Sequence, residues 1–163
     1  MENEGYINIF KNLINMHVNP LDIKRNILEF GSGPYPALKI LLGEKGYNVF
    51  DFDPFYNNND DYKKRKYQLI TTTEVVEHFT NPLKEFSHLF DLLEEDGYLV
   101  IMTRFRTMDI EGFLKWWYRR DLTHISFFNL KTFEYIGNKY NADIVSHNDV
   151  NIITMQKKNS KIN

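Results

Sequence analysis

The feature that most constrains the fold is the stretch ILEFGSGPYPAL at residues 27–38, which reads as the end of a strand, a glycine turn and the start of a helix. Gly31 allows a sharp turn, and Gly33 lets a ligand approach the backbone N–H groups. A dinucleotide-binding turn has a third glycine so that a pyrophosphate can reach the helix N-terminus. Tyr35 and Pro36 fill that space here. The turn therefore predicts a ligand site that disfavours a pyrophosphate.

The rest of the chain alternates strand and helix patterns. Helical spacing or capping predicts helices at 5–16, at 36–45, at 82–93 and after Asn129. Strands are expected at 27–30, 47–52, 67–73 and 98–103, with EEDG as a turn at 94–97 and a C-terminal antiparallel pair at 142–147 and 150–158. This alternation predicts an α/β fold: a three-layer α/β/α, Rossmann-like sheet that is mostly parallel with an antiparallel C-terminal strand.

One interval in this alternation is too short. Only FYNNNDDYKKRK separates Pro54 from the strand that begins at Tyr67. A doubly wound sheet normally places a helix, a strand and loops in such an interval. We therefore expect a sheet shortened at the edge between its second and third strands, with a solvated, charged loop in place of the missing unit.

Composition limits the function classes. A length of 163 residues predicts a single domain, with an N-terminal helix in 1–20 and a connection at 104–128 on the acceptor side. A net charge of −2 argues against general nucleic-acid binding, and the absence of cysteine excludes disulfides and thiolate zinc sites. No apolar run has transmembrane length, and the acidic start MENEGY has no signal-peptide shape, so we expect no membrane partner and a cytoplasmic protein. The sequence does not predict an oligomeric state.

Two carboxylates indicate the kind of ligand. Glu29 stands at the mouth of the first strand, where it would repel a phosphate and attract an ammonium or a sulfonium group. Asp53 ends the next strand, where a carboxylate can accept both hydroxyls of a ribose. The pair suits a nucleoside without phosphates that carries a cationic amino-acid tail, as S-adenosylmethionine does. The alternative is that Glu29 is a helix-terminus or salt-bridge residue and the glycines only make a tight turn.

Four blocks in order carry a family resemblance: ILEFGSGP, NVFDFDP, YQLITTTEVVEHF and LLEEDGYLVIMT. With them, the chain resembles class I S-adenosylmethionine-dependent methyltransferases, including small-molecule O-methyltransferases. The resemblance implies the cofactor S-adenosylmethionine and the product S-adenosylhomocysteine. It implies a cofactor site made of Glu29, Gly31, Gly33, Asp53, Thr73 and Glu74, with Asp51 as the neighbouring alternative to Asp53.

The chain departs from the family at two places. Tyr35 stands where many members have glycine, which narrows the pocket. Members often use an acidic residue in the shortened unit to bind the adenine amino group. That contact is either absent here or supplied by Asp60 or Asp61.

The block TEVVEH places Glu74, Glu77 and His78 at i, i+3 and i+4, so a helical turn would project them to one side. With His124 from the distant RRDLTH, they could hold a divalent Mg²⁺ or Mn²⁺ ion. Small-RNA terminal 2′-O-methyltransferases are similar in pairing this turn with a later histidine. Ubiquinone-pathway O-methyltransferases resemble the chain in the turn alone. In the metal-free alternative, Glu74 lines the cofactor pocket and His78 orients the loop.

Glu74 and His124 are the candidate catalytic residues. Without a metal, His124 could deprotonate a hydroxyl, because imidazole titrates near neutral pH, or it could be a structural histidine paired with Asp121. The aromatic side chains around it form either an acceptor wall or the packing of a lid helix: Trp116, Trp117, Tyr118, Phe127 and Phe128.

The leading prediction is methyl transfer from S-adenosylmethionine to an oxygen or nitrogen of a small-molecule acceptor. One alternative is a non-catalytic, methyltransferase-like binding or regulatory domain, which the shortened edge would favour. The other is a metal-assisted 2′-O-methyltransferase acting on RNA, with Arg119 and Arg120 as a local phosphate contact.

Overall fold

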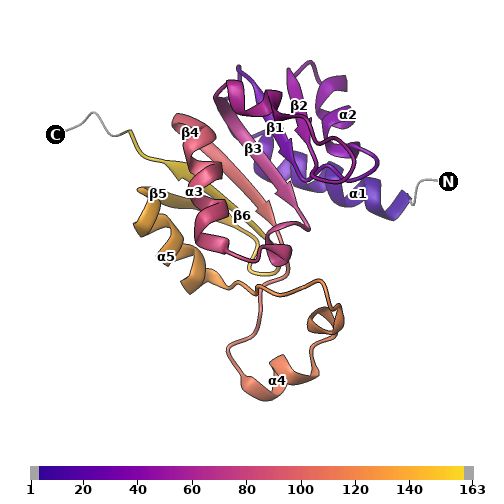
Figure 1. The fold of residues 1–163 in the computed structure, drawn as a ribbon, viewed down its shortest axis with the longest axis vertical. Coiled ribbons are helices and arrows are strands. Elements are labelled where there is room, and N and C mark those ends of the chain that lie inside the picture. The colour runs from indigo at the N-terminus through magenta and orange to yellow at the C-terminus, as the bar shows by residue number, and fades with distance from the viewer. Residues whose placement is uncertain (1–3, 160–163) are drawn as a thin grey trace.

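A six-stranded sheet forms the centre of the molecule. A computed structural model describes residues 4–159 and orders the strands β2-β1-β3-β4-β6-β5 (Figure 1). The first four strands are parallel, and β6 runs antiparallel to both β4 and β5. The strands are β1 Ile27–Phe30, β2 Val49–Phe52, β3 Tyr67–Thr73, β4 Leu93–Met102, β5 Ala142–His147 and β6 Ile152–Lys157. The predicted fold class, with its antiparallel C-terminal strands, is confirmed.

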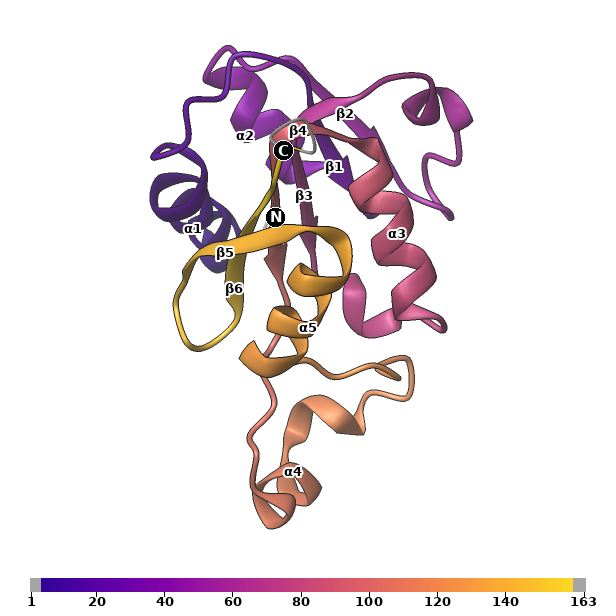
Figure 2. The ribbon, with the colours of Figure 1, turned by 90° about the vertical axis from the view of Figure 1, so that its left-hand side faces the viewer.

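Helices cover both faces of the sheet. They are α1 Glu4–Leu13, α2 Ala37–Glu44, α3 Pro82–Leu92, α4 Ile110–Lys115 and α5 Leu130–Tyr140. Figure 2 shows α1 and α2 on one side of the strands and α3 and α5 on the other. Leu13 and Leu38 belong to the first of two apolar cores, and Phe86 and Phe133 to the second. The Asn129 side chain accepts a hydrogen bond from the Thr132 N–H and so caps α5, as the sequence predicts.

The segment EEDG was wrongly expected to be a turn that precedes the fourth strand. β4 instead runs through it from Leu93, with Asp96 at a φ of 60° and a register shift against β3 between Tyr67 and Leu69. An irregularity of this kind accommodates extra residues within a strand pair without ending the pairing. The early part of β4 therefore stays in the sheet.

The shortened edge is present, but its connecting segment is not wholly solvated. β2 is the edge strand, and residues 60–64 form only a short 3-10 helix before β3. Tyr62, inside that helix, is only 6% exposed. Its ring centroid lies 4.1 Å from that of Phe52, so one aromatic side chain of the segment is part of the core.

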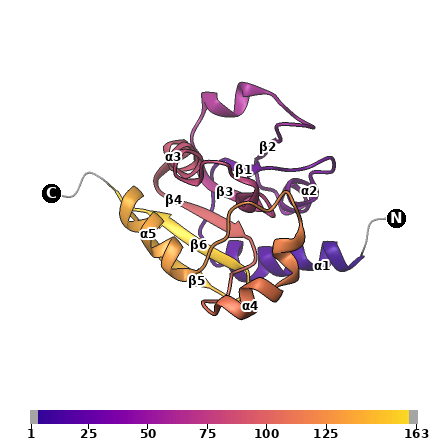
Figure 3. The same ribbon diagram turned by 60° about the horizontal axis from the view of Figure 1, so that its bottom comes forward.

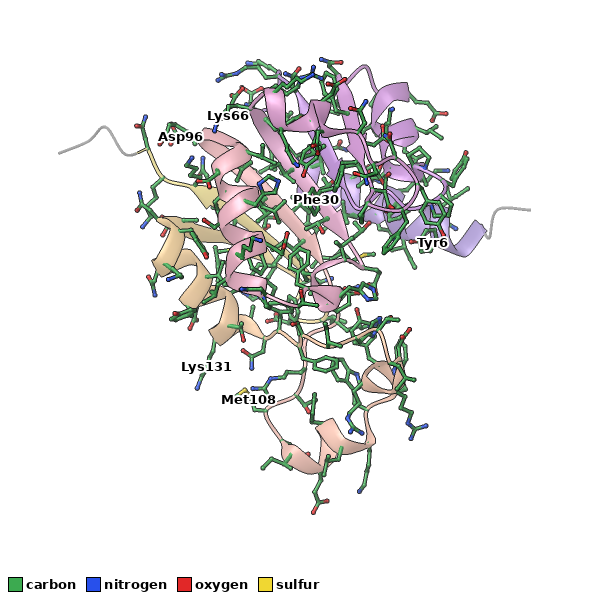
Figure 4. The ribbon with its side chains drawn as sticks, in the orientation of Figure 1. Tyr6, Phe30, Lys66, Asp96, Met108 and Lys131 are labelled. Carbon is green, nitrogen blue, oxygen red and sulfur yellow. The ribbon has the colours of Figure 1, made fainter. Side chains whose placement is uncertain are left out.

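Residues 104–128 form an excursion that projects away from the sheet in Figures 1 and 2, and the same segment lies in front of the strands in Figure 3. None of the residues of α4 within it is buried, and Met108 lies far from the strands in Figure 4. The excursion is closed at its base, where the Arg106 N–H donates to the Phe128 carbonyl. Among residues 4–159, no helix is both long and apolar enough to cross a membrane.

Candidate functional site

The turn at Gly31 and Gly33 lets neighbouring segments pack closely against its backbone. Gly31 and Gly33 have φ values of 82° and 66°, a region that non-glycine residues rarely adopt. A Cβ at Gly31 would lie 2.3 Å from Val75 Cγ2, so Gly31 also allows the turn after β3 to pack against it. The Gly31 and Ser32 N–H groups donate to the Phe52 carbonyl and tie the turn to the end of β2.

Glu29 is a carboxylate that has little access to water. It is 3% exposed, and its Oε2 accepts a hydrogen bond of 2.8 Å from the Lys39 N–H in the first turn of α2. Burial raises its pKa to about 7, against the backbone hydrogen bond from Lys39. A cationic group bound beside Glu29 would favour the ionised form, so this carboxylate is suited to an ammonium.

Of the two aspartates at the end of β2, Asp53 faces the cavity and Asp51 does not. Asp53 Oδ2 accepts from the Gly33 N–H at 2.8 Å, while its Oδ1 accepts from the Phe55 and Tyr56 N–H groups. Asp51 instead pairs with the Lys39 ammonium on the outer side of the strand. The backbone bonds fix the Asp53 carboxylate while leaving acceptor capacity on Oδ2 for a further donor.

A cavity of about 1170 Å³ with mostly apolar walls joins these parts. Seven of the predicted site residues line it: Glu29, Gly31, Gly33, Asp53, Thr73, Glu74 and His78. Glu77 and His124 are not among its lining residues. The helix α1 also contributes through Tyr6, Ile7 and Phe10, a role that its amphipathic pattern alone did not indicate. Figure 4 labels Tyr6 on α1 and Phe30 on β1.

The turn after β3 brings two carboxylates to one phenol. Glu74 has a φ of 54° and precedes a short 3-10 helix, Val76–His78, so the three predicted residues do not share a regular α-helical turn. The Tyr118 hydroxyl donates to Glu74 Oε2 at 2.9 Å and also reaches Glu77 Oε1. Burial, followed by the charge of Glu77, raises the pKa of Glu74 to about 7. Burial likewise raises the pKa of Tyr118, so the phenol keeps its proton.

Two histidines stand beside Glu77. His78 Nδ1 lies 3.0 Å from the Thr123 carbonyl, and His124 Nδ1 lies 2.8 Å from the Tyr118 carbonyl. A carbonyl only accepts, so each Nδ1 carries a proton, and in the neutral ring this leaves Nε2 as the acceptor. One ligand atom from each of Glu77, His78 and His124 lies within 4.8 Å of the others, and Glu74 is outside this group. Among the described residues, the buried Glu77 Oε2 has no hydrogen-bond partner.

The comparisons with known proteins agree with this arrangement. A family model described as a methyltransferase domain matches residues 10–147. The chain belongs to the methyltransferase family. It is a class I enzyme that uses S-adenosylmethionine, as the order of its sequence blocks predicted. A comparison with curated protein sequences gives no match.

Solved methyltransferase structures share the fold. The magnesium protoporphyrin IX methyltransferase from Synechocystis PCC 6803, with bound S-adenosylhomocysteine, has a TM-score of 0.65 and 16% identity over 94% of this chain and 84% of that chain. A S-adenosylmethionine-dependent methyltransferase from Archaeoglobus fulgidus has a TM-score of 0.65 and 14% identity over 93% of this chain and 94% of that chain. At these identities the likeness shows the fold of the methyltransferase and leaves its acceptor open.

The sequence did not indicate the site role of Tyr118, whose hydroxyl in the methyltransferase contacts the carboxylates of Glu74 and Glu77. The sequence placed Tyr118 in a group of aromatic residues, and most of that group packs on itself: the Trp116 ring lies 5.8 Å from Phe127. Neither of these two rings lines the cavity. A tyrosine among tryptophans carries no local signal for a carboxylate that is 44 residues away in the chain.

Proposed function

We propose that this methyltransferase moves a methyl group from S-adenosylmethionine to an oxygen or nitrogen of a small acceptor. The observation that carries the proposal is the position of Glu29 and Asp53 in one cavity, at the ends of neighbouring parallel strands and on the two sides of the glycine turn. Glu29 would hold the ammonium of the amino-acid tail, and Asp53 would accept a ribose hydroxyl. Apolar walls between them exclude water from the cationic centre.

When bound, S-adenosylmethionine supplies an electrophilic methyl group, so the chain has to align the acceptor and take its proton. Glu74 lines the cavity, and a carboxylate whose pKa is about 7 is suited to accept a proton near neutral pH. His124, the other candidate base, has a side chain that is 10% exposed and does not line the cavity. We therefore assign proton transfer to Glu74.

A methyl-transfer assay tests this assignment. The enzyme is incubated with S-adenosylmethionine carrying a labelled methyl group and with a panel of small hydroxyl and amine acceptors. Glu74→Gln should lower turnover of the accepted compound by about 100-fold or more, the usual contribution of a general base. Glu134→Gln, an exposed change on α5, is the matched control and should turn over at the wild-type rate. Equal turnover in Glu74→Gln would remove the base role.

We also propose that Glu77, His78 and His124 hold a divalent ion. Their geometry fits one, because backbone carbonyls orient both histidine rings through Nδ1 and a Glu77 carboxylate oxygen lies within 4.8 Å of a nitrogen of each ring. Within the part of the chain that the structure describes, the buried Glu77 Oε2 has no hydrogen-bond partner. Two imidazoles favour Mn²⁺ over Mg²⁺, which prefers oxygen ligands. Glu74 takes no part in this set, which reduces the predicted four ligands to three.

A small acceptor is favoured over RNA. The net charge of the chain is −2, and one of the two arginines expected to contact phosphate is engaged within the excursion, since Arg119 Nη1 donates to the Leu114 carbonyl. Membership of an enzyme family likewise favours catalysis over a non-catalytic binding domain.

A further inference from the structure

The cavity extends past the two cofactor-binding carboxylates into the shortened edge of the sheet. Phe30 and Phe52 line it there, followed by Tyr62 from the 3-10 helix at 60–64 and by Glu85 and His88 from α3. This end lies beside the segment that takes the place of the missing helix and strand. The shortened unit therefore contributes to the wall of the cavity.

Aromatic rings form this wall. The Phe30 centroid lies 5.2 Å from Phe52 and 6.3 Å from His88, and the Phe52 centroid lies 4.1 Å from Tyr62. At the rim, Phe55 follows Asp53 closely in the chain and is 87% exposed. Flat apolar surfaces of this kind suit a flat heteroaromatic ring.

A phenol and an imidazole supply the polar groups at this end. Tyr62 Oη lies 3.0 Å from His88 Nε2. Burial raises the pKa of Tyr62 to about 12 and lowers the pKa of His88, so both groups are neutral near pH 7. When the phenol donates to Nε2, its oxygen keeps its lone pairs free to accept. Together with the Glu85 carboxylate, this end of the cavity presents acceptors, which suit an amino group.

The acidic residues expected to fill this role are engaged elsewhere. Asp60 forms an ion pair of 2.6 Å with Lys63, and Asp61 pairs with Lys64. Neither aspartate lines the cavity, so the sequence-based expectation that one of them binds the adenine amino group has no support in the structure.

We propose that Tyr62, positioned by His88, is a specificity-determining residue that accepts a hydrogen bond from the exocyclic amino group of the cofactor's adenine. The proposal rests on the proposed function, because it requires the nucleoside to lie in this cavity. In this proposal, the buried Tyr62 of the short segment at the sheet edge makes the adenine contact that the missing helix and strand would otherwise provide.

Two ligands that differ at one position of the purine test the proposal. S-adenosylhomocysteine carries the amino group, and S-inosylhomocysteine carries an oxo group in its place. In calorimetry, the wild type should bind S-adenosylhomocysteine about tenfold more tightly than S-inosylhomocysteine. The amino group donates one hydrogen bond to Tyr62, whereas the oxo group would place an acceptor against an acceptor. Tyr62→Phe removes only the phenol oxygen and should lower the ratio to about threefold or less.

Matched variants complete the experiment. Tyr135→Phe alters an exposed phenol on α5 that does not line the cavity, and it should keep the wild-type ratio. His88→Leu frees the Tyr62 hydroxyl to donate to the oxo group, so it should also bring the ratio toward one. An unchanged ratio in folded Tyr62→Phe and His88→Leu would overturn the proposal while leaving cofactor binding intact. Failure of the wild type to bind S-adenosylhomocysteine would overturn the proposed function itself.

Discussion

The Tyr118 hydroxyl lies 2.9 Å from Glu74 Oε2, and this bond joins the excursion at 104–128 to the cavity wall. The same hydroxyl also reaches Glu77 Oε1, and one phenol proton serves only one acceptor at a time. The two carboxylates therefore compete for it, and the charge of Glu77 contributes to the raised pKa of Glu74.

Tyr118→Phe should destabilise the protein by about 1–3 kcal/mol, because two poorly hydrated carboxylates lose their shared donor. Loss of the hydrogen bond from the Tyr118 hydroxyl should also raise the pKa of Glu74 further. Urea unfolding at pH 7 measures the first effect. Tyr135→Phe, which alters an exposed phenol on α5, is the control. Equal stability of the two variants would show that the Tyr118 hydroxyl does not stabilise the fold.

The contribution of Glu29 and Glu74 to stability should fall as pH rises from about 4.5 to about 7. The folded-state pKa values of Glu29 and Glu74 are about 7, above the usual 4.5, so protonation favours the folded state. Their contribution is complete below pH 4.5 and is lost as pH rises through 7. The loss should be on the order of 3 kcal/mol for each of the two carboxylates in urea unfolding. Glu29→Gln should make the free energy of unfolding depend less steeply on pH. An equally steep dependence in that variant would show that Glu29 does not contribute to it.

Asp53→Asn should weaken S-adenosylhomocysteine binding about tenfold, through the loss of a charge-assisted hydrogen bond to the ribose. Asparagine keeps one oxygen, which can accept either from the Gly33 N–H or from the Phe55 and Tyr56 N–H groups, whereas alanine would leave all three backbone donors without their acceptor. Asp51→Asn is the matched control on the outer side of β2, and its affinity should stay within about twofold of the wild type. If the two variants lose affinity equally, Asp53 is not the ribose ligand.

Mn²⁺ should raise the melting temperature by about 3 °C or more, because an ion that binds only the folded state stabilises it. His124→Ala and Glu77→Gln should each abolish that rise, since each removes one of three ligands. His147→Ala is the control, because its imidazole pairs with Asp149 beyond the end of β5. A melting temperature unaffected by Mn²⁺ and Mg²⁺ in the wild type would end the metal proposal.

The strand ends and the glycine turn could be predicted because their signals are local. Gly31 and Gly33 require a particular backbone. Asp51 and Asp53 are two residues apart and would share one face of a regular strand, so they are separated by the end of β2 at Phe52 and not by strand alternation. Residues at the ends of adjacent parallel strands are brought together by the topology alone. The positions of Glu29 and Asp53 in one cavity therefore follow from sequence pattern and fold class.

The remaining contacts depend on how distant segments pack. Tyr62 meets His88 across 26 residues, and Tyr118 meets Glu77 across 41. Tyr62 lies in an Asn-rich, charged stretch whose composition predicts solvent exposure, and it is buried because its ring packs against Phe30 and Phe52. Contacts of this kind between separate segments leave no local pattern in the sequence.

The most direct test of the account is a calorimetric titration of the wild type with S-adenosylhomocysteine at pH 6.5, repeated in buffers with different ionisation enthalpies. We expect S-adenosylhomocysteine to bind at one site per chain and to release a fraction of a proton, because its ammonium lowers the raised pKa of Glu29. Glu29→Gln should weaken binding and remove most of that release. The absence of binding to the folded wild type, or binding with proton release unchanged in Glu29→Gln, would contradict the account.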